Sequence, residues 1–178
     1  MRRGSIMKVK YLLLASISGA TISLDQLTKM YIHTRFRLQE IHNVTSFFDI
    51  TYVRNFGAAF GVMATTAQKY REPFFLLVPF VALVIIIMIM RGLQDSQKGQ
   101  IFGLSLIFGG AIGNYIDRIR FKFVIDFLDF HYKEIYHWPA FNVADSAIVC
   151  GVSLLILQML LTARTSGKSH VAQPRPSR

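Results

Sequence analysis

Five polar residues beside two apolar segments have the types and the spacing for acid–base chemistry. An asparagine precedes an aspartate by three residues twice, as Asn114 and Asp117 in "GNYIDR" and as Asn142 and Asp145 in "FNVADS". The first pair lies where one apolar segment ends and the second where the next begins, so two antiparallel helices would bring both pairs to the same membrane face. Asp126, in "FVIDFLDF", lies between them. The pattern predicts that several carboxylates converge near one surface of a bilayer.

Two carboxylates held close together can share one proton, because two negative charges a few ångströms apart do not both ionise. The ionised partner is then a general base for a water molecule, and the protonated partner polarises an amide carbonyl. This chemistry hydrolyses a peptide without a metal ion, a cofactor or a nucleophilic side chain. The sequence has no H-E-x-x-H zinc motif, no G-x-S-x-G motif and no Gly-rich phosphate loop. We therefore expect no metal and no cofactor.

The same residues also have structural explanations. Asn142 followed by Asp145 matches a helix-capping pattern, and an acid in the first turn suits the helix dipole. Asp117 beside Arg118 fits an ordinary interfacial ion pair. The glycines of "FGGAIGN" fit helix packing at least as well as a substrate groove. Taken singly, these residues leave both kinds of explanation open.

The composition places the chain in a membrane. Hydrophobic residues make up 52% of its 178 residues and charged residues only 17%, whereas about a quarter of a soluble domain is charged. Four apolar segments reach or approach the roughly 20 residues that cross a bilayer, at about 11–32, 73–90, 99–118 and 141–163. The sequence predicts an α-helical integral membrane protein, with residues 1–164 as a single domain of four transmembrane helices. Cys150, the one cysteine, lies in the fourth segment and is expected to be a buried, inert thiol.

The first apolar segment follows "MRRGSIMKVK", which also fits the start of a secretory signal peptide. Three further segments follow, so we expect an uncleaved first span. It contains Asp25 and Lys29, which lie four residues apart on one helix face in the order that favours an ion pair. We expect this pair to be structural, because each residue neutralises the other.

The distribution of basic residues predicts the orientation. Four spans put both termini on one side, and half of the twenty Lys and Arg residues lie in three short segments on that side. Their density predicts cytoplasmic termini. The net charge of +10 then suits an anionic lipid surface, and we expect no nucleic acid as a partner. Residues 165–178 are expected to be a disordered, basic cytoplasmic tail.

The two segments on the other side predict a small platform outside the membrane. Residues 33–72 contain "FFDITYVRNFGAAFG", whose β-branched and aromatic residues, followed by glycine, predict short strands and a tight turn. "TTAQKYRE" is expected to form a surface helix. In the other segment polar and apolar residues alternate along "RIRFKF", so the third helix is expected to end near Arg118.

Several motifs together resemble one family. "GGAIGNYIDRIRFKFVIDFLDF" and "WPAFNVADSAI" resemble the lipoprotein signal peptidases, the type II signal peptidases of bacteria, and "DQLTK" and "VRNFGAAFG" match in the same order. The resemblance implies an aspartyl endopeptidase of the bacterial cytoplasmic (inner) membrane, with its site near the outer face. It would remove the signal peptide from diacylglyceryl-modified prolipoproteins, by cutting before the lipidated cysteine. Globomycin-type inhibitors are expected to bind, and membrane lipids surround the spans.

The resemblance also implies roles for particular residues. The family's catalytic pair lies in its V-[VI]-D-F and N-x-A-D motifs, which gives Asp126 and Asp145 here. Asn114 and Asn142 are expected to hold these two carboxylates in position by amide hydrogen bonds.

The other matched residues are expected to support the site. Asp117 and Arg118 would fix the end of the third helix. Asn55 and Gly57 would offer polar groups and close backbone approach to an extended peptide. Asp25 and Lys29 match the family's first-helix motif and are expected to be a supporting pair.

Two other classes of protein fit part of the pattern. A small proton-coupled transporter also keeps acids within the membrane, but usually with broken helices and an internal repeat. A non-enzymatic assembly factor would explain the packing glycines but not two convergent acid motifs. Cleavage of a lipidated precursor by the purified protein separates a peptidase from both.

Overall fold

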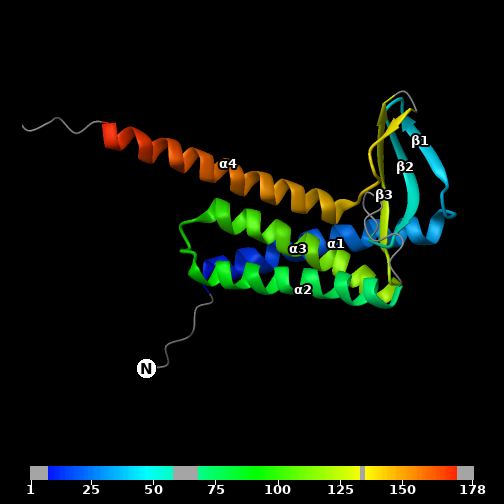
Figure 1. The fold of residues 1–178 in the computed structure, drawn as a ribbon, viewed down its shortest axis with the longest axis horizontal. Coiled ribbons are helices and arrows are strands. Elements are labelled where there is room, and N and C mark those ends of the chain that lie inside the picture. Colours follow the sequence, from blue (N-terminus) through cyan, green and yellow to red (C-terminus); the bar gives the residue numbers. More distant parts are fainter. Residues whose placement is uncertain (1–7, 58–67, 133–134, 172–178) are drawn as a thin grey trace, which may run out of the picture.

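Long helices run side by side, and a small sheet covers one end of them (Figure 1). The computed structural model describes residues 8–57, 68–132 and 135–171, and it describes the side chains of these residues except at 68–72 and 163–171. The described helices are α1 (Val9–Arg35), α2 (Gln68–Gly92), α3 (Lys98–Phe121) and α4 (Val143–Val171). The described strands are β1 (Ile41–Thr45), β2 (Phe48–Asn55), β3 (Val124–Tyr132) and β4 (Tyr136–His137), which pair antiparallel in the order β1-β2-β3-β4. The predicted extramembrane sheet is therefore present.

Within the described residues, three helical stretches are long and apolar enough to cross a membrane: Pro73–Gly92, Lys98–Phe121 and Val143–Thr162. Helix α1 is long enough but more polar, and its polar residues face the other helices. Lys29 is 1% exposed, whereas Leu27 is 70% exposed. A helix that buries its lysine and exposes its leucine suits a surrounding of lipid rather than water. Helix α1 is thus the fourth transmembrane helix.

The helices extend further than the apolar segments that predicted them. Helix α3 ends at Phe121, where Lys122 adopts a left-handed conformation with φ 67°, and not near Arg118 as expected. The predicted surface helix is wrong where it can be checked, because residues 68–72 are the first part of α2, and residues 65–67 lie outside the described residues. Apolar composition marks only the part of a helix that crosses hydrocarbon. The helices continue into the headgroup region, where polar residues are favourable.

The C-terminal end of α4 shows the same difference. The tail was expected to be disordered from residue 165, but α4 continues to Val171, and residues 172–178 lie outside the described residues. Cys150 was expected to be buried, yet it lies exposed on α4. An apolar run predicts contact with lipid as well as burial in protein, and on α4 it reflects lipid contact.

Glycines let α3 approach its neighbours closely. A Cβ atom at Gly110 would overlap the carbonyl oxygen of Ala144 on α4, and one at Gly113 would press on the carboxylate of Asp25 on α1. These glycines of "FGGAIGN" therefore pack helices together, as one of the two sequence-based interpretations proposed.

The lysine near the start of α1 ties two helices together at the end opposite the sheet. Lys10 is 3% exposed, and its Nζ donates hydrogen bonds to the carbonyl oxygens of Met90 (2.9 Å), Arg91 (2.9 Å) and Leu93 (2.7 Å). Met90 and Arg91 lie in the last turn of α2, where helical carbonyls lack partners within the helix, and Leu93 directly follows its end at Gly92. Lys10 thus caps α2 from a different helix.

We expect Lys10→Met to lower the free energy of unfolding in detergent by about 1–3 kcal/mol, because buried carbonyls lose their donor. Thermal unfolding followed by the fluorescence of the single tryptophan, Trp138, measures this change. Lys8→Met, at an exposed position two residues earlier, is the matched control. Equal melting temperatures for the two variants would contradict the capping role.

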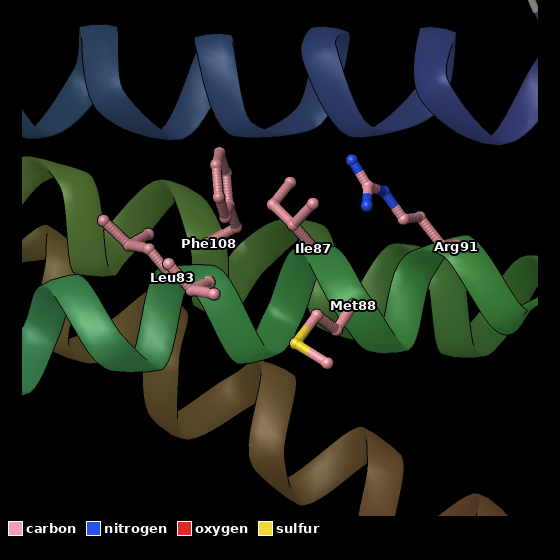
Figure 2. A pocket seen from close by; sticks show the side chains of 6 residues that line it. Leu83, Ile87, Met88, Arg91 and Phe108 are labelled. Carbon is pink, nitrogen blue, oxygen red and sulfur yellow. The ribbon is translucent and has the colours of Figure 1, made fainter.

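A shallow apolar crevice of about 290 Å³ lies on the α2 and α3 side of the helices (Figure 2). Leu83, Ile87, Met88 and Phe108 line it, with Arg91 at one end. Arg91 is the one charged side chain among the described residues that line it. A wall of this kind can accommodate a lipid chain, but it holds no acid–base pair.

Candidate active site

The candidate site lies where the sheet meets the helices. Strand β3 pairs with β2 and contributes Ile125 and Phe127 to a buried cluster with Ile32 of α1 and Tyr52 of β2. Successive side chains on a strand point to opposite faces, so Asp126 lies on the face opposite these two apolar residues.

Asp126 is buried and held by two amides. The residue is 1% exposed, and its Oδ2 accepts a hydrogen bond of 2.9 Å from Asn55 Nδ2. Its Oδ1 accepts one of 2.7 Å from Asn142 Nδ2. Asn55 comes from β2 and Asn142 from the residue before α4, so two separate elements fix one carboxylate.

Asp145 lies in the first turn of α4 and is partly exposed. Its Oδ1 accepts a hydrogen bond of 2.7 Å from Asn114 Nδ2, and its Oδ2 accepts one of 3.3 Å from the backbone N–H of Asn142. In return, the N–H of Asp145 donates to Asn142 Oδ1 at 2.9 Å. This reciprocal pair is a capping box, so the capping interpretation of Asn142 and Asp145 is confirmed.

The capping contact does not exclude a pair of cooperating carboxylates, because Asn142 contacts Asp145 and Asp126 with different atoms. Its Oδ1 and backbone N–H engage Asp145, and its Nδ2 donates to Asp126. One fully buried asparagine therefore connects the two carboxylates that the sequence singled out.

Burial, and next the negative charge of Asp145, raise the pKa of Asp126 to about 7, against an ordinary value of 3.8. The hydrogen bonds from Asn55 and Asn142 favour the ionised form but lower the pKa by less than burial raises it. Near neutral pH, Asp126 therefore holds a proton far more readily than an ordinary aspartate, which suits a general acid.

A buried ion cluster lies behind this pair. Lys29 Nζ is 2.9 Å from Asp25 Oδ2 and 3.0 Å from Asp117 Oδ2, and all three residues are 1% exposed or less. The predicted ion pair of Asp25 with Lys29 is confirmed. Lys29 Nζ also donates to Asn114 Oδ1 at 2.8 Å. This contact fixes which end of the Asn114 amide is the acceptor, and it directs the Nδ2 donor to Asp145.

Asp117 lies in this cluster, and within the described part of the chain it shares no hydrogen bond with Asp126 or Asp145. It accepts hydrogen bonds from Gln26 Nε2 (3.0 Å) and from the backbone N–H of Ile125 (3.1 Å). Among the described residues its ion-pair partner is Lys29, and not Arg118. Arg118 donates to the carbonyl of Asn114 at 3.3 Å, at the end of α3 as expected. Asp117 thus joins α1, α3 and the start of β3.

The carboxylate of Asp25 also reaches α4. Its Oδ1 accepts a hydrogen bond of 2.9 Å from the backbone N–H of Ala144, which is in the first turn of that helix. Gln26, which follows Asp25, contacts both Asp25 Oδ2 (3.2 Å) and Asp117 Oδ1 (3.0 Å). Sequence reasoning missed Gln26; its position in "DQLTK", between the two members of an ion pair, was the available signal.

Asn55 and Gly57 form a turn at the end of β2. Gly57 has φ 91°, which favours glycine, and its N–H donates to Asn55 Oδ1 at 2.8 Å. Both polar ends of the Asn55 amide are therefore occupied within the protein, one by this turn and one by Asp126. A Cβ atom at Gly57 would overlap the ring of Phe75 on α2. Asn55 thus positions Asp126 in this structure, and Gly57 shapes the adjacent turn.

Comparisons with known proteins agree with this arrangement. A bacterial membrane enzyme of known structure superimposes with a TM-score of 0.72 at 29% identity, over 90% of this chain and 97% of that one. A lipoprotein signal peptidase of Geobacter metallireducens is 45% identical over 165 residues, which cover 92% of this chain and 100% of that protein. One of Francisella tularensis subsp. novicida is 38% identical over 89% of this chain and 96% of that protein. The family described as signal peptidase (SPase) II matches residues 17–161. The chain belongs to the signal peptidase II family.

Proposed function

We propose that this protein is an intramembrane aspartyl endopeptidase that removes the signal peptide from diacylglyceryl-modified prolipoproteins, by cutting before the lipidated cysteine. The observation that carries the proposal is the contact of Asn142 with both Asp126 and Asp145. The family supplies the class of reaction and of substrate.

The two aspartates have different environments and therefore different roles. Asp126 is buried, and its pKa of about 7 lets it hold a proton. This proton is donated toward the oxygen of the scissile carbonyl. Asp145, partly exposed and held by Asn114, takes a proton from water as the water oxygen adds to the carbonyl carbon. When the C–N bond breaks, Asp145 returns that proton to the leaving nitrogen, and Asp126 regains its own from the collapsing intermediate.

The setting is the bacterial cytoplasmic membrane, with the sheet on the outer side. The start of α1 and the end of α4 lie at the end of the molecule opposite the sheet (Figure 1). Large hydrophobic side chains are exposed around β4, where Ile135, Tyr136 and Trp138 are each at least 67% exposed. Aromatic residues of this kind favour the headgroup level of a bilayer. The site would then face a substrate whose lipid is anchored in the outer leaflet, and membrane lipids and globomycin-type inhibitors are the other expected ligands.

Purified protein in detergent, incubated with a synthetic diacylglyceryl-modified precursor peptide, tests the function. We expect one cleavage, directly before the lipidated cysteine, identified by mass spectrometry. The same peptide without its lipid is the control and should be cut much more slowly. No cleavage at any tested pH or lipid composition would refute the peptidase assignment for this chain.

Topology provides a separate test. A reporter fused after Arg164 should be cytoplasmic, because the density of basic residues near the start of α1 and the end of α4 favours that side. A reporter inserted in the exposed β1–β2 turn at Ser46 should be external. A reporter near Lys69 would instead interrupt α2, which begins at Gln68. The opposite pattern would place the carboxylates on the wrong side for a secreted precursor.

A further inference from the structure

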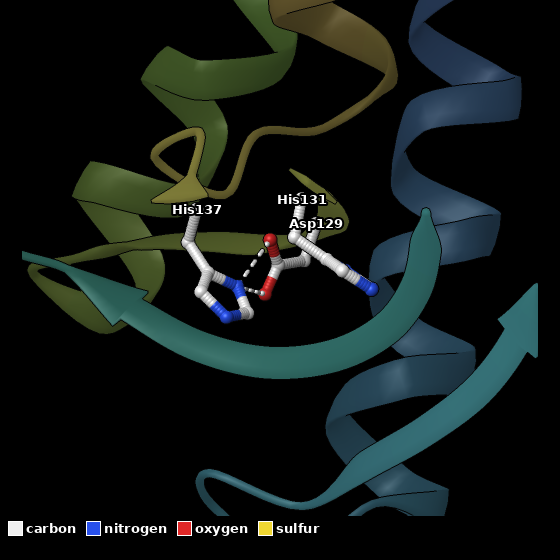
Figure 3. A group of neighbouring side chains, drawn as sticks. All are labelled: Asp129, His131 and His137. Atoms are coloured by element: carbon white, nitrogen blue, oxygen red, sulfur yellow. Dashed lines mark hydrogen bonds and ion pairs between the residues drawn. The ribbon is translucent and has the colours of Figure 1, made fainter. Parts of the chain in front are cut away.

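A second cluster of titratable side chains lies in the sheet, apart from the carboxylate pair (Figure 3). Asp129 and His131 belong to β3, and His137 belongs to β4. Residues two apart on a strand share a face, so Asp129 and His131 point to the same side of β3. The register pairs His131 directly with His137 across the two strands. Three potential metal ligands thus meet on one face of a two-stranded hairpin.

The distances suit ligands of a single ion. One ligand atom from each residue lies within 4.8 Å of the other two. His137 Nδ1 is 3.1 and 3.2 Å from the two oxygens of Asp129, and the two imidazole rings have centroids 5.1 Å apart. Ligands at about 2 Å from a common ion lie about 3–4 Å from each other, so only small side-chain movements are needed.

A buried nitrogen in the cluster lacks a partner. The side chain of His131 is 2% exposed, and its Nδ1 has no hydrogen-bond partner in the part of the chain that the structure describes. Asp49 Oδ2 is the nearest opposite charge, at 3.5 Å, and Asp49 itself is held by Asn43 Nδ2 at 3.0 Å. Nearly all buried polar atoms in native proteins are hydrogen-bonded, so an exception of this kind calls for an explanation. A cation between the three residues would bind to imidazole nitrogen and remove the need for a proton donor.

We propose that Asp129, His131 and His137 form a binding site for a divalent transition-metal ion, with Zn²⁺ as the best match. Two imidazoles and one carboxylate, with a water molecule as fourth ligand, suit the tetrahedral preference of Zn²⁺. Asp49 Oδ2 lies 3.5 Å from the same Nδ1 of His131, so its negative charge also favours a cation at that nitrogen. His137 is 45% exposed at its side chain, which leaves a route from solvent to the site.

The site is structural and not part of the hydrolytic reaction. Asp129 lies three residues beyond Asp126, and an odd spacing on a strand puts the two carboxylates on opposite faces. Strand β4 has only two residues and two pairings with β3, which is marginal for an isolated hairpin. An ion bound to both strands would fix β4, together with the exposed aromatic residues beside it, onto the sheet.

Zinc titration of the full-length protein tests this proposal. The protein must carry no polyhistidine tag, and a chelator must first remove bound metal. We expect calorimetry with ZnCl₂ to show one site per chain, and Co²⁺ to give the intense visible absorption of tetrahedral coordination. Removing a residue that merely orients a ligand weakens metal binding by about 10–100-fold, so losing a ligand in His137→Gln should weaken it by at least as much.

His42→Gln is the matched control. His42 lies on β1 of the same sheet and contacts a single carboxylate, Glu40, at 2.8 Å. His42→Gln should bind zinc like the parent. Zinc should raise the melting temperatures of the parent and of His42→Gln, but not that of His137→Gln. Melting without zinc checks that His137→Gln is folded, and Asp129→Asn is a second ligand variant if it is not. No micromolar zinc site in the parent, or equal zinc binding by His42→Gln and His137→Gln, would refute the site.

Discussion

Asp126→Asn and Asp145→Asn are each expected to abolish cleavage of a lipidated precursor while the protein stays folded and inserted. Asparagine has nearly the shape of aspartate but neither accepts a proton from water nor donates an acidic one. Loss of a general acid or base reduces a rate by about 10²–10⁴-fold, and the loss is larger when both groups act as one unit. Single-turnover rates with the precursor peptide measure the effect. The double variant should be no slower than either single variant, because members of a catalytic unit are not additive.

Stability separates this result from simple damage to the fold. In Asp126→Asn the new amide retains one of the two hydrogen bonds that Asp126 accepts, and the donor left without an acceptor costs about 1–3 kcal/mol. Against this, asparagine removes a carboxylate whose ionisation is opposed by burial. In the unfolded chain Asp126 loses its proton near pH 4, and in the folded protein near pH 7. Between these values the unfolded state binds fewer protons, so this residue makes the parent less stable as the pH rises.

The melting temperature of Asp126→Asn, relative to the parent, should therefore increase from pH 5 to pH 8. Asp95→Asn is the matched control for the chemical change, because Asp95 accepts a hydrogen bond from the N–H of Lys10 at the opposite end of the helices. Asp95→Asn should cleave the precursor at the rate of the parent. If Asp145 only completed the capping box, Asp145→Asn would keep both stability and turnover, since an amide oxygen at this position still accepts from the Asn142 N–H. That pair of measurements on one variant decides between a cap and a catalyst.

The sequence predicted which elements meet at the site because its signals there are strong and local. The repeated N-x-x-D spacing placed Asn114 and Asn142 at adjoining helix ends, and hydrogen bonds of Asn142 to Asn114 and Asp126 confirm that they meet. The alternation in "RIRFKF" predicted a break between Asp117 and Asp126, and the structure has one, three residues later than expected.

The details of the contacts were beyond sequence reasoning, for a physical reason. Capping and catalysis were weighed as alternatives for Asp145, yet a single side chain at Asn142 caps with Asp145 and also contacts Asp126, because its oxygen and nitrogen face different neighbours. Similarly, Asp117 was matched with its neighbour Arg118, but Lys29 reaches it from another helix. Helical periodicity specifies which residues share a face, and it does not specify which long side chain crosses between helices.

Lys29→Met should destabilise the protein more than any other single change to the network behind the site. It leaves the buried carboxylates of Asp25 and Asp117 facing each other without a cation. Removing one partner of a buried ion pair costs about 3–5 kcal/mol, since the remaining charge is neither solvated nor paired. Lys10→Met is the matched control, because it removes another buried lysine of α1 that contacts carbonyl groups and no carboxylate with its ammonium. Melting in detergent should rank parent, Lys10→Met and Lys29→Met in descending order of stability.

A second substitution makes this prediction specific to charge. Asp117→Asn added to Lys29→Met should restore part of the lost stability, because it removes one of the two unpaired carboxylates and keeps an acceptor for the Ile125 N–H. In the parent background, Asp117→Asn breaks an existing pair and should lower folded yield at least as much as it lowers specific activity. A double variant less stable than Lys29→Met would show that packing, and not charge, sets the role of Lys29. A well-folded Asp117→Asn protein without turnover would move Asp117 from the supporting cluster into the catalytic set.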